Sequence, residues 1–368
     1  MAIKNINPSK LRKTILVAPL DWGLGHTTRC IPLISKLLEK RHHVILAGDK
    51  AQEVLLTTEF PGIPFLPLKG YNIKYGTSGK KTVLQLLWQA PGILKSAKKE
   101  NEWLGSVIKK YSIDAVLSDN RFGLYSSQIP SVFITHQLYI ASPLGAITAQ
   151  WVQKRNYSFI NKFSECWVPD FPEANSLAGK LSHPEKKPSI PVKYIGPLSR
   201  FRFENNQQQN GLLVILSGPE PQRSIFETII LRELENYNGK ATVIRGLPGA
   251  GSFIPSVPNV TFYNHLPAKE MEREINKSSM VIGRCGYSTV MDMAVLKKSC
   301  VLVPTPGQTE QLYLARHLTE NNIAACIHQE NFSLRKAIEL AHQFSGNFAV
   351  RDTSAVLDNA VDSFLSAI

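Results

Sequence analysis

The chain has 368 residues, 43% of them hydrophobic and 19% charged, which suits a globular protein with an ample core and enough length for two domains. Its five cysteines are scattered without C-x-x-C spacing, so we expect a reducing cytoplasm rather than a disulfide framework or a zinc site. No window approaches the roughly 18 apolar residues of a membrane-spanning helix. The apolar run at residues 15–20 is too short for the core of a signal peptide.

The formal net charge of +13 is unevenly distributed. Residues 1–199 contain 26 Lys and Arg against 13 Asp and Glu, whereas residues 200–368 contain 16 of each. This asymmetry can attract an anionic partner, although lysines that are simply solvated explain it equally well. No motif that combines aromatic and basic residues accompanies the charge, so we expect no nucleic-acid partner.

The first half of the chain alternates short apolar runs with helical patterns, which is typical of a parallel sheet covered by helices on both faces. We predict strands at residues 14–20, 43–47, 64–68, 115–118, 131–135 and 165–168. We predict helices at residues 28–40, 51–59, 83–111 (interrupted at Pro91 and Gly92) and 144–163.

The same alternation restarts in the second half, after two polar stretches at residues 182–191 and 204–210. We therefore predict an α/β protein with two Rossmann-like, doubly wound parallel-sheet domains that face a cleft, residues 1–198 and 199–368. The final helix could cross back to the first domain. Clefts between domains are favoured ligand sites. The predicted strands of this half are 211–216, 241–245, 260–262, 280–282, 300–303 and 324–327.

One stretch of the second half, residues 284–311, carries most of the functional information. It contains a glycine turn, an amphipathic helix predicted at residues 287–298, a short apolar strand, a Pro/Gly loop and a second helix that starts at Thr309. Polar side chains near the carboxyl ends of buried strands converge on ligands in open α/β sheets. The sequence therefore predicts a ligand site here.

Five residues of this stretch follow a pattern: Arg-x-Gly-x-x-Thr, an acidic residue three positions on, a Pro-rich loop and a glutamine at a helix start. It resembles the donor-binding region of GT-B glycosyltransferases, above all the lipid-linked peptidoglycan N-acetylglucosaminyltransferase family with its glycosyltransferase family 28 C-terminal domain. The resemblance implies a GT-B fold and a hexosyltransferase that works in the cytoplasm or at the inner face of the membrane. The matching residues are Arg284, Gly286, Thr289, Asp292 and Gln311.

The resemblance implies a nucleotide-sugar donor, and the residue types suit one. The Asp292 carboxylate could accept hydrogen bonds from ribose hydroxyls, although the usual Glu of the family is one bond longer. The helix start, with the Ser288 and Thr289 hydroxyls, could face the diphosphate, because the helix dipole favours negative charge there. Glu310 or Gln311 could hold hydroxyls of the sugar. The alternative is that Ser288 only caps a helix and Asp292 is a solvated helix residue.

A second candidate for phosphate contact follows the first strand of this half. Related enzymes have a glycine-rich loop there, but Pro219 and Pro221 each remove a donor from this one. Phosphate binding would depend on Ser217, Gly218 and the Arg223 guanidinium, and an ordinary strand-to-helix loop is the alternative. The resemblance also places a base pocket near Arg245, Gly246, Asn264, His265 and Leu266, where His265 could equally be an ordinary loop residue.

In the first half, a Gly-x-Gly turn joins the first strand to the first helix. Such a turn also occurs in dinucleotide sites, and Asp49 could be the acidic ribose ligand, so an oxidoreductase stays open. However, Thr28 stands where the third glycine would be. His26 directly follows Gly25, and Gly-x-Gly-His resembles the family element that faces the cleft.

In a transfer with inversion, a base removes the proton of the acceptor hydroxyl. We predict His26 as this base and Asp119, at a strand end, as its orienting carboxylate. The alternatives are a loop-stabilising or diphosphate-binding histidine and an ordinary turn aspartate. No D-x-D element is present, so we expect neither a metal nor a cofactor. Predicted acceptor contacts are Gly25, Thr27, Arg29, His136 and Gln137, where local capping by the last two is the alternative.

The predicted helical segment at residues 83–111 is both apolar and basic, with Leu84, Leu87 and Trp88 near Lys80 and Lys81. It could rest on anionic lipid headgroups, which would suit an anionic or lipid-linked acceptor and peripheral membrane contact through the basic half. An amphipathic helix pair packed on its own sheet is the alternative.

Two other functions stay open. Gly25-His26-x-x-Arg29 also resembles the opening of hydrolases that release sugars from UDP during nonulosonate synthesis. A non-catalytic protein that binds a sugar nucleotide is the remaining alternative.

Overall fold

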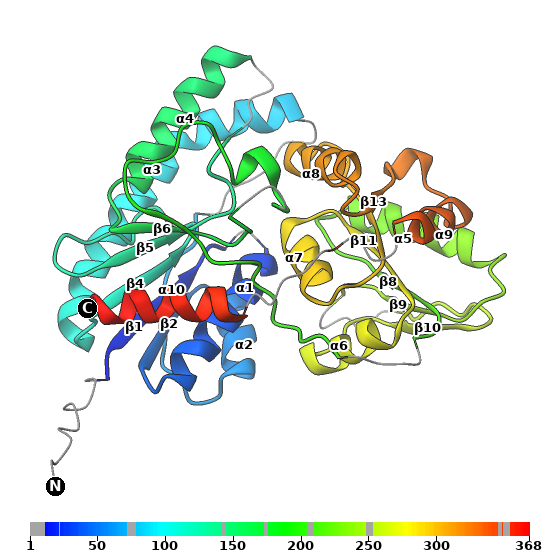
Figure 1. Cartoon of the computed structure of the whole chain (residues 1–368), viewed down its shortest axis with the longest axis horizontal. Coiled ribbons are helices and arrows are strands. Elements are labelled where there is room, and N and C mark those ends of the chain that lie inside the picture. The colour runs from blue at the N-terminus through cyan, green and yellow to red at the C-terminus, as the bar shows by residue number, and fades with distance from the viewer. Residues whose placement is uncertain are drawn as a thin grey trace, which may run out of the picture.

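The computed structural model describes residues 12–21, 23–71, 79–140, 145–172, 176–204, 209–247, 253–344, 348 and 354–368, with only the main chain at 79–91, 146–147 and 354. Two parallel sheets lie side by side, each flanked by helices (Figure 1). The strands of the first are β1 (Thr14–Pro19), β2 (His43–Gly48), β3 (Phe65–Pro67), β4 (Ala115–Asp119), β5 (Ser131–Ile134), β6 (Glu165–Val168) and β7 (Val192–Tyr194). The strands of the second are β8 (Leu212–Ile215), β9 (Ala241–Ile244), β10 (Val260–Tyr263), β11 (Met280–Arg284), β12 (Cys300–Val303) and β13 (Ala325–Cys326).

The strand orders are those of doubly wound sheets. The first sheet runs β3-β2-β1-β4-β5-β6-β7 and the second β10-β9-β8-β11-β12-β13. The order reverses between β1 and β4 and between β8 and β11, and ligands bind at the carboxyl ends of strands at such switch points. The predicted two-domain α/β fold is confirmed. The short strand β7, which carries Lys193 after Pro191, was missed because three residues give no clear alternation.

The helices differ from the prediction at two places that matter. The first helix begins at Leu24 rather than at residue 28, directly after Gly23 with its positive φ of 72°. His26 therefore lies in the first turn of this helix. The third helix continues through Pro91 and Gly92, so the predicted interruption is wrong. Proline removes one main-chain hydrogen bond, but the 33-residue helix remains continuous. The helices are α1 (Leu24–Glu39), α2 (Lys50–Glu59), α3 (Gly79–Tyr111), α4 (Ala146–Ile160), α5 (Gln222–Leu234), α6 (Ala268–Lys277), α7 (Tyr287–Val295), α8 (Thr309–Glu320), α9 (Leu334–Gln343) and α10 (Ser354–Ser366).

Both faces of the first sheet are buried, as the apolar runs predict. Ile15 and Val17 of β1 face a core shared with α1, whereas Leu16 and Ala18 face another that includes Leu104 of α3. The first of these cores continues into the second domain, where it includes residues of α7 and α8. The domains are therefore joined by apolar packing as well as by the connecting chain.

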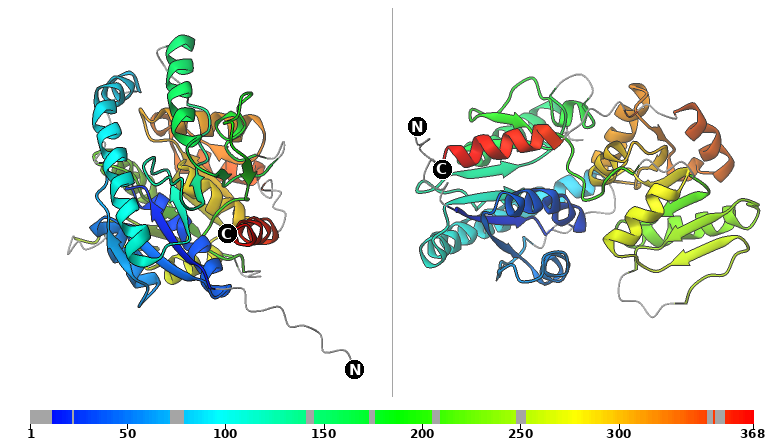
Figure 2. Two further views of the ribbon diagram at one scale, coloured as in Figure 1. Left: turned by 90° about the vertical axis from the view of Figure 1, so that its left-hand side faces the viewer. Right: turned by 60° about the horizontal axis from the view of Figure 1, so that its bottom comes forward.

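The last helix, α10, lies against the first domain, although it follows the second in sequence (Figure 2). Asp358 pairs with Lys36 at 3.0 Å and Asp362 with Lys40 at 2.8 Å, both lysines belonging to α1. Phe364 meets the buried Trp167 ring edge-on. The two sheets are separated in the chain by residues 195–211. A boundary at residues 198 and 199 remains our proposal.

None of the helices within the described ranges is long and apolar enough to cross a membrane. The predicted lipid-facing side chains of Lys80, Lys81, Leu84, Leu87 and Trp88 lie outside the described residues.

Candidate active site

The loop that leads from β1 to His26 is held by three other segments. The side-chain amide of Gln52, in α2, donates to the main-chain carbonyls of Pro19 and Leu20, at 3.1 and 2.9 Å. Arg121, which follows β4, donates through Nε to Pro19 at 2.7 Å, and Asp21 accepts from the Tyr71 amide at 3.1 Å. The start of this loop, Pro19 to Asp21, is therefore anchored by side chains and main chain of other segments.

His26 and Asp119 meet at the switch point of the first sheet. Asp119 ends β4 opposite Pro19 of β1, and His26 opens α1 above the same two strands. The His26 Nδ1 lies 2.9 Å from Asp119 Oδ1. The Asp119 side chain is fully buried, whereas that of His26 is 15% exposed and can reach a bound molecule.

Charge around this pair favours a neutral imidazole and an ionised carboxylate. Burial first, and then the positive charge of Arg29, lower the pKa of His26, against the opposing effect of Asp119. Burial alone would raise the pKa of Asp119, but Arg29 and His26 outweigh it and hold this pKa well below its usual range.

Arg29 lies one turn after His26, on the same side of α1. Its Nε donates to Asp119 Oδ2 at 2.5 Å and its Nη2 to Asp119 Oδ1. The residue is only 2% exposed. The structure thus places this predicted acceptor contact inside the protein, as the cation of a buried pair.

The network crosses from the first domain to the second through His136. Its Nδ1 accepts from Arg29 Nη1 at 3.1 Å, and its Nε2 lies 2.9 Å from Glu310 Oε1, at the start of α8. The His136 ring stacks on Tyr287 of α7 with centroids 4.1 Å apart, and the Tyr287 hydroxyl donates to the Pro169 carbonyl. Glu310, a predicted sugar ligand, is thus paired with the opposite domain.

The first turn of α7 lies directly against the first turn of α1. The Ser288 hydroxyl donates to the Gly25 carbonyl at 3.2 Å. A Cβ on Gly25 would stand 2.7 Å from the same hydroxyl oxygen, so glycine permits this close approach. His26, the candidate base, and the start of α7, the predicted diphosphate site, therefore lie close together where the two domains meet.

Asp292, the predicted ribose ligand, is held by the segment between the domains. Ser199 Oγ donates to Asp292 Oδ1 at 2.6 Å. Burial raises the pKa of Asp292 to about 7, although Ser199 and the charge of Arg200 act against the rise. In the free protein this carboxyl group is therefore partly protonated near neutrality.

The arginines predicted to contact phosphate and base are occupied within their own domain. Arg223 donates to Glu220 at 2.6 Å, to Glu227 at 2.8 Å and to the Arg245 carbonyl. Arg245 pairs with Glu227 and donates to Asn264 at 2.8 Å. The predicted phosphate role of Arg223 is not supported by this arrangement, because its side chain is 7% exposed and fully paired.

Arg284 is also inside the domain. It is 2% exposed, lies over the Phe226 ring and donates through Nη2 to the Gln222 carbonyl at 2.7 Å. Burial lowers its pKa to about 10. Its Nε and Nη1 have no hydrogen-bond partner among the described residues.

The remaining predicted residues fall into two groups. Gln311 is engaged locally, since it accepts from the Thr305 amide at 2.8 Å and donates to Gln308. Thr27 is fully buried and its hydroxyl lies 3.4 Å from the Gln52 amide, so no surface is left for an acceptor. Leu266 is also buried, so the members of this first group are paired locally or have little or no surface to offer a ligand. The second group is accessible: Ser217, Gly218 and His265 are exposed, and Gly286, Thr289 and Gln137 are partly exposed.

Comparison with known proteins points to a glycosyltransferase. Residues 251–357 match the glycosyltransferase family 28 C-terminal domain. A Haemophilus ducreyi protein named UDP-N-acetylglucosamine–N-acetylmuramyl-(pentapeptide) pyrophosphoryl-undecaprenol N-acetylglucosamine transferase is 23% identical over 90% of this chain and 89% of its own length. An uncharacterized glycosyltransferase of Methanosarcina acetivorans is 25% identical over 92% and 94%.

Solved structures show the same fold. The glycotransferase of kitacinnamycin superposes with a TM-score of 0.65 at 16% identity, over 96% of this chain and 99% of that one. Acinetobacter baumannii MurG does so with a TM-score of 0.57 at 14% identity, over 97% and 100%. These findings support a glycosyltransferase with the GT-B fold, whose residues 251–357 match a family 28 C-terminal domain.

Several residues of this glycosyltransferase site were not predicted from the sequence. Ser199 and Tyr287 carry no motif, and their contacts join segments 93 and 118 residues apart. Gln52 and Arg121 are ordinary polar residues until the fold brings them to the β1–α1 loop. In the structure Asp49 and Gln52 form a capping box at the start of α2, so Asp49 acts as a helix cap rather than as a ribose ligand.

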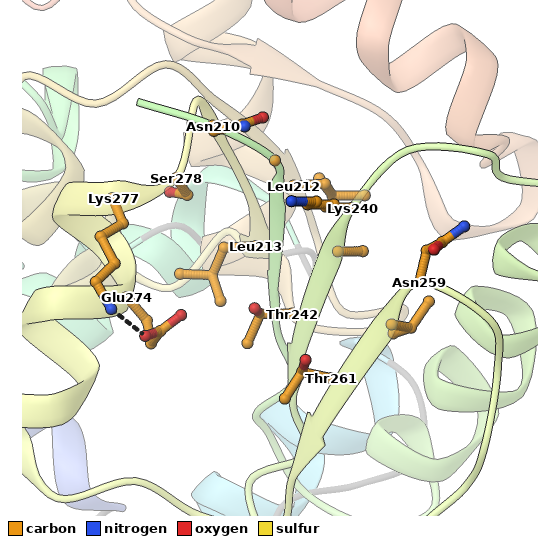
Figure 3. Close-up of a pocket in the computed structure, with 13 residues that line it drawn as sticks. Asn210, Leu212, Leu213, Lys240, Thr242, Asn259, Thr261, Glu274, Lys277 and Ser278 are labelled. Atoms are coloured by element: carbon orange, nitrogen blue, oxygen red, sulfur yellow. Dashed lines mark hydrogen bonds and ion pairs between the residues drawn. The ribbon is translucent and has the colours of Figure 1, made fainter. Parts of the chain in front are cut away.

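A hollow of about 450 Å³ lies at the other end of the second sheet (Figure 3). Lys240, Asn259 and Lys277 surround it near the amino ends of β8, β9 and β10. It lies away from the switch point where the predicted donor ligands gather, so we do not count it as part of the active site.

Proposed function

We propose that this glycosyltransferase moves a sugar from a UDP-sugar to a hydroxyl of an anionic or lipid-linked acceptor, with inversion at the anomeric carbon and no step assigned to a metal ion. The contact of Gly25 with Ser288 carries the proposal, because it sets the His26 loop against the helix start that suits a diphosphate. The UDP donor and lipid-linked acceptor are supported by the name of the Haemophilus ducreyi relative.

His26 is the proposed general base. Its Nδ1 faces Asp119, so the neutral ring carries its lone pair on Nε2, for which no hydrogen bond is seen among the described residues. As the acceptor oxygen attacks the anomeric carbon, the bond to the diphosphate breaks and the hydroxyl proton moves to Nε2. Asp119 then stabilises the imidazolium. A well-placed base supplies about 10²–10⁴-fold in rate.

The donor is proposed to lie along the start of α7. The first amides of a helix lack intrahelical acceptors, and with the dipole they stabilise the negative charge of a leaving diphosphate. Ser288 and Thr289 add hydroxyls. Asp292 offers its second oxygen to ribose while Ser199 holds the first, and Glu310 with Gln311 is assigned to the sugar.

The acceptor is proposed to approach from the first domain, past Gly25, His136 and Gln137. The excess of Lys and Arg in residues 1–199 supports an anionic acceptor and peripheral contact at the inner face of a membrane.

The test is a thermal-shift screen with UDP, GDP, dTDP and their sugars, followed by product analysis. A donor at about 100 times its Kd should add about 2.7 kcal/mol to the unfolding free energy. Asp292→Ala should reduce the shift, whereas Arg335→Ala, at an exposed position of α9, should keep it. Absence of any shift, or an undiminished shift in Asp292→Ala, would contradict the donor site. Release of free sugar without an acceptor would instead identify a UDP-sugar hydrolase.

A further inference from the structure

The Asp119 carboxylate is shared between His26 and Arg29. Its Oδ1 accepts from both His26 Nδ1 and Arg29 Nη2, and its Oδ2 accepts from Arg29 Nε and, at 3.5 Å, from the Cys30 thiol. A histidine–carboxylate pair without a second cation leaves the full negative charge to the imidazole. Here a guanidinium in two-point contact, itself buried, takes most of that charge.

The remaining nitrogen of the Arg29 guanidinium, Nη1, binds His136. A guanidinium only donates hydrogen bonds, so His136 Nδ1 must accept and the ring proton lies on Nε2, which donates to Glu310. A protonated His136 would place a donor against the donor of Arg29. The guanidinium is therefore held at three of its nitrogens, and its position does not depend on a bound substrate.

The charged and titratable groups that act on His26 come from four segments. They are Arg29 on its own helix, Asp119 at the end of β4, His136 after β5 and Glu310 at the start of α8. Arg29 is the group among these that opposes protonation of His26 while also binding its carboxylate partner. Its effect on the imidazole thus has a direct Coulombic part and a part that passes through Asp119.

We propose that Arg29 is a positioning residue: by binding both oxygens of Asp119 it weakens the pull of this carboxylate on His26 and so keeps His26 an uncharged base. The arrangement orients the imidazole as a carboxylate does, but without the strong stabilisation of the imidazolium that an unshared carboxylate gives. The catalytic consequence rests on the proposed function of His26. The effect on protonation does not, because it is a property of the free protein.

Histidine NMR on the free full-length chain tests the effect on protonation directly. The chain has nine histidines, and His26→Gln identifies the signal of interest. In the parent, the His26 midpoint should lie below the ordinary histidine value. In Arg29→Gln the charge of Asp119 is no longer opposed, so the midpoint should rise by about one pH unit or more. An unchanged or lower midpoint in Arg29→Gln would overturn the proposal.

Arg29→Lys keeps the test decisive if Arg29→Gln does not fold. Lysine retains the charge but not the two-point contact, so the His26 midpoint should stay near that of the parent while the imidazole is less well oriented. A rise as large as that expected for Arg29→Gln would contradict the charge argument. Arg335→Gln serves as the control for removal of a remote exposed arginine and should leave the midpoint unchanged.

Kinetics then separate this inference from the proposed function. If His26 is the base, the acidic limb of kcat/KM should follow the NMR midpoint and move to higher pH in Arg29→Gln. In Arg29→Lys, kcat should fall with little change in KM and no shift of the limb. If the midpoint moves but the limb does not, Arg29 controls the protonation of His26 as inferred and the assignment of His26 as base is wrong.

Discussion

The two switch points of this glycosyltransferase are built differently. In the first domain, polar groups from distant parts of the chain meet in a buried network, with Asp119 accepting from His26 and Arg29. In the second, Arg223 is paired with its near neighbours Glu220 and Glu227, and Gln311 with Gln308. Asp292, Ser288 and Glu310 of this domain contact residues far away in sequence. Folding thus holds the candidate base His26 in position before a ligand binds. On the donor side, by contrast, few of the predicted side chains are free to bind a ligand.

This difference indicates a division of labour. Removing a group of the first domain should affect the chemical step or stability, because each is buried and shared. The donor side should depend more on main-chain amides at the start of α7 and on Asp292, so single side-chain changes there should have smaller effects on rate.

The largest expected effect is that of His26→Ala. Loss of the base should lower kcat by about 10²–10⁴-fold, equivalent to roughly 3–5 kcal/mol, with little change in the thermal shift caused by a UDP-sugar. Steady-state transfer assays with the donor found in the screen measure this. Activity within a few-fold of the parent would show that the network of the first domain is structural.

Asp119→Ala should have the next largest effect, on stability. It leaves the Arg29 guanidinium buried without its carboxylate, which typically costs about 3–5 kcal/mol. Urea unfolding should show this loss, and Asp119→Ala combined with Arg29→Met should recover much of it. If the single variant unfolds at the urea concentration of the parent, the pair contributes little.

The sequence predicted the fold better than the network. Alternating apolar runs located most strands because burial on two faces leaves a clear pattern. The motif at residues 284–311 located Asp292 and the start of α7, since its chemistry is local. The pairing of Arg29 with Asp119, 90 residues apart, leaves no local signal. Thr27 and Arg29 were predicted to contact the acceptor because they belong to the same Gly-x-Gly-His segment as His26. Thr27 points away from the site because adjacent residues of a helix face different directions, whereas Arg29 lies on the side of His26 but is bound to the buried Asp119.

Asp292 should make stability depend on pH. The folded group, with a pKa near 7, keeps a proton that the unfolded chain has released above about pH 4. Its contribution is therefore complete below about pH 4 and is lost as pH rises through 7. Asp292→Asn has no titrating group at this position, so it lacks this loss of stability. Between pH 5 and pH 8 the unfolding free energy of the variant should therefore rise by about 2–3 kcal/mol relative to that of the parent. An equal difference at both pH values would contradict the raised pKa.

The smallest effect tests the contact between the two helix starts. Gly25→Ala would bring a methyl group within 2.7 Å of the Ser288 hydroxyl, which must then rotate away from the Gly25 carbonyl. Because this hydroxyl is the end of a small side chain, we expect a cost of about 1 kcal/mol in stability. In the Ser288→Ala background the same substitution meets no hydroxyl, so its cost should largely disappear. An equal cost in both backgrounds would mean that the two first turns do not touch in solution, and the base and the donor site would then have to meet by another movement of the domains.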